Sequence, residues 1–161
     1  WRHLRRIARE FLAYPVRPPP ESLCQAATTQ CLAAWARLCR SGLCVAFTDV
    51  DPYPDAPNMR AEVSATGRLY AYALGTPARG IPQEVNRRFR AAHDAFAHAP
   101  KGAPGFDFPG ELAAARMHAA SCPHLADWYA SEVLGQAAVY LYTGEYPEQR
   151  FVPGAAAWLS F

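Results

Sequence analysis

The sequence has 161 residues, of which 51% are hydrophobic and 19% are charged, and its formal net charge is +2. This composition is that of a globular protein and excludes a disordered or fibrous chain. The length suits one domain with a substantial core, so we expect a single domain over residues 1–161.

The cysteines and the lack of long apolar runs indicate in which cellular compartment the protein is expected. The number of cysteines, five, is odd and no C-x-x-C pair occurs, so we do not expect a disulfide framework. No run of about 18 apolar residues is present to span a bilayer. We therefore expect a cytoplasmic protein with no membrane segment.

The first forty residues predict two helices joined by a connector. In residues 1–14 the apolar positions recur at helical spacing and the arginines lie on the other face, which predicts an amphipathic helix that stops before Pro15. Four prolines in residues 15–20 predict an extended connector. A longer helix is predicted over 21–40, where Ser41 and Gly42 supply a stop.

The next forty residues predict a small β element. Residues 43–50 are rich in β-branched and aromatic side chains, and residues 68–74 alternate in polarity, so both are predicted strands. A short helix over 57–65, which begins with proline and ends before Gly67, separates them. Residues 75–80 are predicted to form a loop.

The remaining residues are predicted to be mostly helical. One helix opens at Pro82 and ends near Pro100; a loop over 101–109 follows, then a helix over 111–120. The helix predicted over 124–142 is apolar nearly all round and should be central. Two strands cannot form a large sheet, so we expect a mainly α protein with a small two-stranded β element (α+β) and a helical core.

Polar side chains gather in the helix that opens at Pro82. His93 and His98 are five residues apart, which places them about 140° apart on an ideal α-helix. Both imidazoles can reach one metal only if the helix is distorted or ends near His98. Asp94 is four residues before His98, where its carboxylate can orient that imidazole or ligate in its place.

Two later helices also carry polar residues within apolar patterns. Glu111 and His118 are seven residues apart and so nearly aligned, and Glu132 and Gln136 are four apart on the most apolar helix. A lone carboxylate at Glu132 would be costly unless it were paired or bound to a metal.

Two interpretations of these residues stay open at this point. In the first, two histidines and a carboxylate form a facial site of the kind that binds iron(II) and leaves positions open for oxygen or substrate. In the second, the same side chains hydrogen-bond one another and tie helices together without metal.

The run Phe89 to His98, followed by Gly110-Glu111, His118 and Ser131 to Gln136, resembles a poorly characterised family from phages and mobile elements. Its pattern is close to F-R-x-x-H-D-x-F-x-H, then G-E, H and T-E-x-x-G-Q. The likeness covers roughly residues 45–145 and implies no established activity.

The H-D-x-x-x-H run is also similar to the iron-binding segment of the pterin-dependent aromatic amino acid hydroxylases, which carry H-D-x-x-G-H and a later glutamate. This resemblance implies His93, His98 and Glu132 as metal ligands. It carries over a ligand set and nothing about pterin or an aromatic substrate.

The first hypothesis is therefore a protein with one divalent metal, iron favoured over zinc or manganese, and an oxygenase-like activity on an unknown small-molecule substrate. The predicted ligands are His93, His98 and Glu132. The residues predicted to orient these ligands or to bind substrate are Asp94, Glu111, His118 and Gln136. No catalytic residue is assigned. The alternative is a non-enzymatic accessory domain of a mobile element that engages a protein partner. Nucleic-acid binding through the arginines of residues 87–90 is a third hypothesis, and we do not expect it.

Overall fold

The computed structural model describes residues 1–74 and 80–161 and confirms the predicted fold class, mainly α with a two-stranded sheet. Most of the loop predicted over 75–80 lies outside the described residues. The α-helices are α1 (Arg2–Ala13), α2 (Glu21–Arg40), α3 (Ala56–Thr66), α4 (Gln83–His93), α5 (Phe108–Ser121), α6 (Ala126–Tyr129) and α7 (Gln136–Thr143). The strands are β1 (Cys44–Thr48) and β2 (Arg68–Tyr72), and two π-helical segments (Asp94–His98, Ala130–Gly135) and two 3-10 helices (Pro123–Leu125, Ala155–Ser160) complete the described elements.

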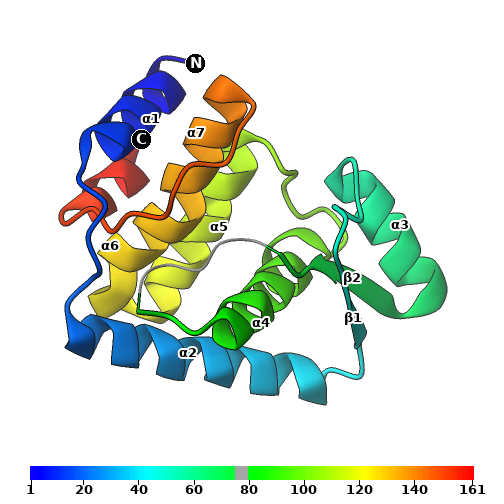
Figure 1. Ribbon diagram of the computed structural model, residues 1–161. Helices are drawn as coiled ribbons and strands as arrows, with labels where there is room; N and C mark the ends of the chain where they lie inside the picture. Colours follow the sequence, from blue (N-terminus) through cyan, green and yellow to red (C-terminus); the bar gives the residue numbers. More distant parts are fainter. Residues whose placement is uncertain (75–79) are drawn as a thin grey trace.

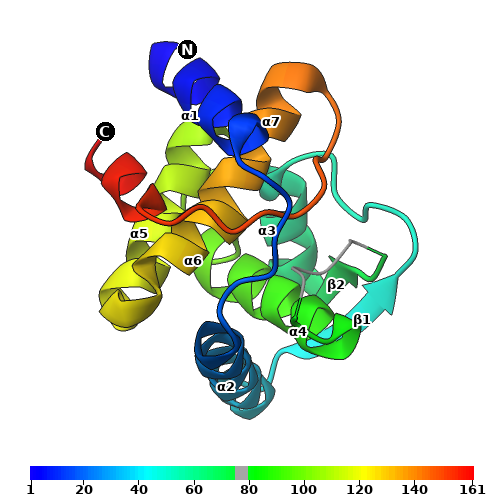
Figure 2. The same cartoon turned by 60° about the vertical axis from the view of Figure 1, so that its left-hand side comes forward.

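The helices pack as a bundle with α2 along one side. Helix α1 lies beside α7, and α2 lies beside α4, far from α1, in both views (Figures 1 and 2). The buried residues of α1, Leu4, Ile7, Ala8 and Phe11, follow the predicted helical spacing. Within the described part of the chain, no helix combines the length and the apolar character needed to cross a membrane.

The two strands and α3 form a β-α-β unit at one end of the molecule (Figure 1). Strands β1 and β2 pair in parallel, with Cys44 opposite Arg68 and Thr48 opposite Tyr72. A parallel pair needs a crossover connection, which α3 supplies. The Asp55 side chain caps α3 by accepting a hydrogen bond from the Asn58 backbone N–H at 2.8 Å.

Helix α4 uses two arginines to pack against its neighbours. Arg87 lies over the Phe47 ring and Arg88 over the Trp35 ring, and both form ion pairs with Glu84. These two arginines, which the nucleic-acid hypothesis invoked, are therefore engaged within the chain.

The long helix predicted over 124–142 is helical throughout but not uniform. A 3-10 turn precedes α6, the π segment Ala130–Gly135 follows it, and α7 continues to Thr143. The helix predicted from Pro82 likewise changes from α to π at Asp94. Periodicity over a few residues does not distinguish α from π winding, so both changes were missed.

The tail after Tyr146 packs over the bundle. It contains the 3-10 helix Ala155–Ser160, whose Trp158 is buried and donates from Nε1 to the Glu10 carboxylate at 2.7 Å. The Asp127 carboxylate accepts hydrogen bonds from the backbone N–H groups of Gly154 and Ala156. These bonds fix the tail to α1 and α6.

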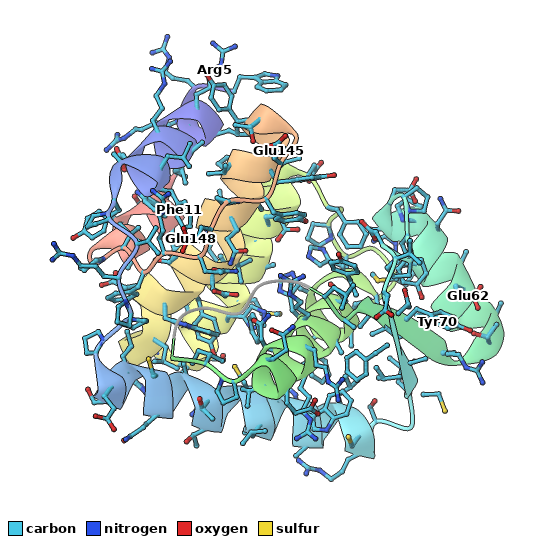
Figure 3. The ribbon with its side chains drawn as sticks, in the orientation of Figure 1. Arg5, Phe11, Glu62, Tyr70, Glu145 and Glu148 are labelled. Carbon is cyan, nitrogen blue, oxygen red and sulfur yellow. The ribbon has the colours of Figure 1, made fainter. Side chains whose placement is uncertain are left out.

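Gly135, the last residue of the second π segment, lies against Phe11 of α1. A Cβ atom at Gly135 would lie 2.4 Å from Phe11 Cδ2 and 3.2 Å from Trp158 Cζ3. Phe11, labelled in Figure 3, is itself fully buried, so its ring has little room to retreat. We expect Gly135→Ala to lower the free energy of unfolding by about 1–3 kcal/mol, the usual cost of overpacking a core.

Urea denaturation of the parent and the variant measures this cost. The Phe11→Leu background provides the control, because it removes the ring edge that the new methyl group would meet. The alanine should then cost clearly less; an equal cost in both backgrounds would contradict the contact as its cause.

Candidate metal centre

The first π segment brings His93 and His98 together. A π turn bonds residue i to residue i+5, so residues five apart stack nearly one above the other. The Ala99 N–H donates to the Asp94 carbonyl at 2.9 Å, which is such a bond. The Nε2 atoms of His93 and His98 consequently lie 3.1 Å apart, despite the 140° that an α-helix would put between them.

The start of α5 supplies a carboxylate to the same point. Asp107 caps this helix by accepting from the Gly110 N–H at 2.9 Å, so α5 begins at Phe108, three residues before the predicted start. Gly110 lies against the preceding loop, because a Cβ there would be 1.9 Å from the Gly105 carbonyl oxygen. The close approach explains the glycine of the G-E pair and sets Glu111 on the first turn.

The side chains of His93, His98 and Glu111 form a group that can hold a metal ion. One ligand atom from each residue lies within 4.8 Å of the other two. The Glu111 oxygens Oε2 and Oε1 lie 3.6 Å from His93 Nε2 and His98 Nε2, respectively. The His98 side chain is fully buried, and those of His93 and Glu111 are 12% and 13% exposed, so the group is at the edge of the core and solvent reaches it.

The ring nitrogens of His93 and His98 that point away from the group each contact another polar group. His98 Nδ1 lies 3.2 Å from the Pro104 carbonyl oxygen, and His93 Nδ1 lies 3.1 Å from His118 Nε2. A carbonyl can only accept, so His98 carries its proton on Nδ1 and leaves the Nε2 lone pair free. If His93 donates from Nδ1 to His118, its Nε2 lone pair also points into the group, as a metal ligand requires.

Arg60 of α3 fixes the loop that carries the Pro104 carbonyl. Its Nη1 atom donates to the backbone carbonyls of His98 at 3.0 Å and Ala103 at 3.1 Å, and it lies 3.5 Å from that of Pro104. The β-α-β unit is thereby tied to the segment that orients His98.

Burial keeps the histidines of the group neutral and favours protonated acids. It lowers the pKa of His93 to about 4 and that of His118 to about 3, and it lowers the pKa of His98 as well. Burial raises the pKa of Glu111 to about 7, against the opposing effect of His98. The neutral imidazoles can bind a metal at neutral pH without losing a proton. The Glu111 carboxyl group must be deprotonated to bind, and a metal cation would displace its proton.

Asp94 lies beside the group but does not orient His98 by a hydrogen bond. Burial and then the nearby Glu111 raise the pKa of Asp94 to about 8, although Arg90 acts in the opposite direction. The acceptor for His98 is the Pro104 carbonyl instead. The predicted orienting role of Asp94 is therefore taken by backbone.

Glu132 and Gln136 lie in a separate polar network. Glu132 Oε1 accepts from Gln149 Nε2 at 3.3 Å, and Gln136 Nε2 donates to both the Glu132 backbone carbonyl and Gln149 Oε1. All three residues are buried, and burial raises the pKa of Glu132 to about 7. The structure thus groups Glu111 with the two histidines, whereas the resemblance to hydroxylases implies Glu132.

Several residues of this region had no assigned role in the sequence. Arg60 stood within the stretch that resembles the phage family, but nothing indicated its carbonyl partners. Gln149 lies in the tail, and no spacing pattern connects it to Glu132. The Pro104 carbonyl is a backbone group, so its role could not be predicted from residue type.

The comparisons with known proteins found no match. No protein-family model, no curated protein and no solved structure matches the chain. The resemblance to a phage family stays a prediction.

Proposed function

We propose that this protein binds one divalent metal ion through His93 Nε2, His98 Nε2 and the Glu111 carboxylate. The observation that carries the proposal is the convergence of two imidazole nitrogens and one carboxylate, held by the π turn and by the capped start of α5. Two of the three side chains are oriented by hydrogen bonds from their far nitrogens, as metal-bound histidines usually are.

The distances suit a metal with little rearrangement. A metal about 2.0–2.1 Å from each histidine nitrogen would see the two Nε2 atoms, 3.1 Å apart, at an angle of roughly 95–100°. The 3.6 Å separations to Glu111 correspond to a wider angle, of about 120°. In the tautomers that ligation requires, the two lone pairs face each other and repel unless a cation lies between them.

Two histidines and one carboxylate leave coordination positions open for other molecules. This donor set is that of the iron(II) facial triad, in which the open positions bind oxygen or substrate, and we propose iron(II) and an oxygenase-like reaction on a small molecule. Zinc and manganese fit the same donors, and zinc would instead polarise a substrate or activate water.

Elemental analysis of protein purified without an affinity tag or chelator tests the metal centre. The parent should contain about one metal per chain, either as purified or after anaerobic reconstitution with iron(II). His98→Ala and Glu111→Gln should contain little, because each removes one of three ligands. Glu132→Gln should keep its metal, because the network of Glu132 lies apart from the group.

The outcomes separate the competing assignments. Loss of metal in Glu132→Gln with retention in Glu111→Gln would favour the ligand set that the hydroxylase resemblance implies. Absence of metal from the parent after reconstitution would contradict the proposal.

A second function is favoured by one observation: the three imidazoles are already in hydrogen-bond contact in series, from His118 to His93 to His98. Such a chain can tie α4 to α5 without metal, in an accessory domain that engages a protein partner. Under this alternative His98→Ala lowers the melting temperature of a protein that never contains metal.

A further inference from the structure

Arg90 differs from the other arginines of α4 in having no ion pair with any residue that the structure describes. It is half-buried and lies one helical turn before His93. Arg87 and Arg88 both pair with Glu84, whereas Arg90 has no hydrogen bond or ion pair to any residue in the described ranges 1–74 and 80–161. A half-buried guanidinium with no fixed acceptor indicates a place for an anionic ligand.

Arg90 shares a face of α4 with the metal centre. Asn86, Arg90 and His93 follow one another at spacings of four and three residues, which places them on one side of the helix. Asn86 is only 2% exposed, and its Nδ2 donor has no partner among the described residues. The side of α4 that carries His93 therefore also carries two donor groups, the Asn86 amide and the Arg90 guanidinium, that have no acceptor among the described residues.

The groups around Arg90 do not neutralise it by contact. Burial raises the pKa values of Asp94, Glu132 and Tyr146, and the charge of Arg90 opposes part of this rise, so all three lie within its electrostatic range. Neither of the two carboxyl groups forms an ion pair with Arg90 in the described part of the chain, where the ion pairs of α4 are those of Arg87 and Arg88 with Glu84. Arg90 thus lies one helical turn from His93 without an ion-pair partner among the described residues.

We propose that Arg90 binds the carboxylate of a small substrate while a second oxygen of the same molecule occupies an open position on the metal. The inference rests on the proposed metal centre and names the class of molecule that it takes. A guanidinium matches a carboxylate with two parallel hydrogen bonds, and a divalent metal with one Glu111 carboxylate keeps a positive charge that attracts the same anion. The two anchors together would fix both position and orientation of the substrate.

Cobalt(II)-substituted protein at pH 8 allows a direct test, because its visible absorbance reports changes of ligand at the metal. Cobalt binding is measured first; then oxalate, malonate and succinate are titrated, with acetate as the one-anchor reference. In the parent the best dicarboxylate should bind at least about tenfold more tightly than acetate, as expected for one additional charge-assisted contact. Arg90→Gln should lose this advantage.

Arg88→Gln is the matched control, because Arg88 lies on the opposite side of α4 over Trp35, and it should keep the advantage. The proposal is overturned if the advantage persists in Arg90→Gln, which would mean chelation by the metal alone, or if the parent shows none. A preference for inorganic phosphate over every carboxylate would also overturn it. Failure of the parent to bind cobalt appears before any carboxylate is added, and it overturns the metal centre and this assignment together.

Discussion

Gly110→Ala is expected to disrupt both the stability of the protein and its candidate metal centre. The added Cβ would lie 1.9 Å from the Gly105 carbonyl oxygen, a backbone atom that no side-chain rotation can move aside. Either the start of α5 or the loop before it must shift. We expect the free energy of unfolding to fall by more than about 3 kcal/mol, above the usual range for overpacking, because the clash is with backbone.

The shift should also reach the metal ligands. Glu111 is the next residue, and the loop carries the Pro104 carbonyl that orients His98. Disturbing both should weaken zinc binding more than a hundredfold, beyond the 10–100-fold that loss of one orienting partner costs. Urea denaturation without metal and a competition titration with a zinc chelator measure the two effects separately.

Gly105→Ala is the control for this prediction. A Cβ at Gly105 would make contacts no closer than 4.0 Å, so the same chemical change should be nearly neutral there. A Gly110→Ala protein as stable as the parent, with unchanged zinc affinity, would show that α5 and the loop separate without cost and that this contact does not position Glu111.

Glu132→Gln is expected to make the metal-free protein more stable above pH 7. Burial raises the pKa of Glu132 from about 4.5 to about 7, so between these values the folded state holds a proton that the unfolded state releases. This proton stabilises the fold at low pH, and the contribution is lost as pH rises through the folded pKa. The loss amounts to about 3 kcal/mol, and glutamine, which has no proton to lose, should avoid it.

Denaturation of parent and variant at pH 5 and pH 8 measures how the stability difference between them changes with pH. The variant should be close to the parent at pH 5 and more stable by about 3 kcal/mol at pH 8. Taking the difference between the two proteins cancels the other buried groups, such as His93 and His118, whose lowered pKa values act in the opposite direction. Glu145→Gln, at an exposed position labelled in Figure 3, should show no such change; a flat difference for Glu132→Gln would mean that its carboxyl is not held protonated.

The helices were predictable from sequence because apolar periodicity and local stop signals define them. The amphipathic spacing in α1 and the glycine after α2 gave boundaries within one residue of those observed. Apart from its parallel pairing, which was not predicted, the β-α-β unit followed from two short strand-like runs separated by a helix. These features depend on neighbours in the sequence, which is why the pattern alone was sufficient.

The candidate site was predictable in part, for a physical reason. His93 and His98 were singled out by residue type, but an α-helix would have kept them apart, and π winding depends on packing that spacing does not reveal. Which of the two carboxylates, Glu111 or Glu132, lies beside the histidines also depends on tertiary packing. Both are carboxylates in apolar helices, and only the approach of α5 to the π turn decides which one meets the histidines.

The three proposed ligands lie in the short span 93–111, which consists of the π turn, a loop and the first turn of α5. Loop-closure entropy grows slowly with length, by only about 0.6 kcal/mol for each doubling, so joining the ends of so short a span is inexpensive. A metal bound to all three ligands would act as a cross-link within this span. It would mainly restrict the conformational freedom of residues 93–111 when this segment is open. The ion would therefore slow the opening of residues 93–111 far more than that of α1 and α7, and the protein would acquire one locally reinforced segment in an otherwise unchanged fold.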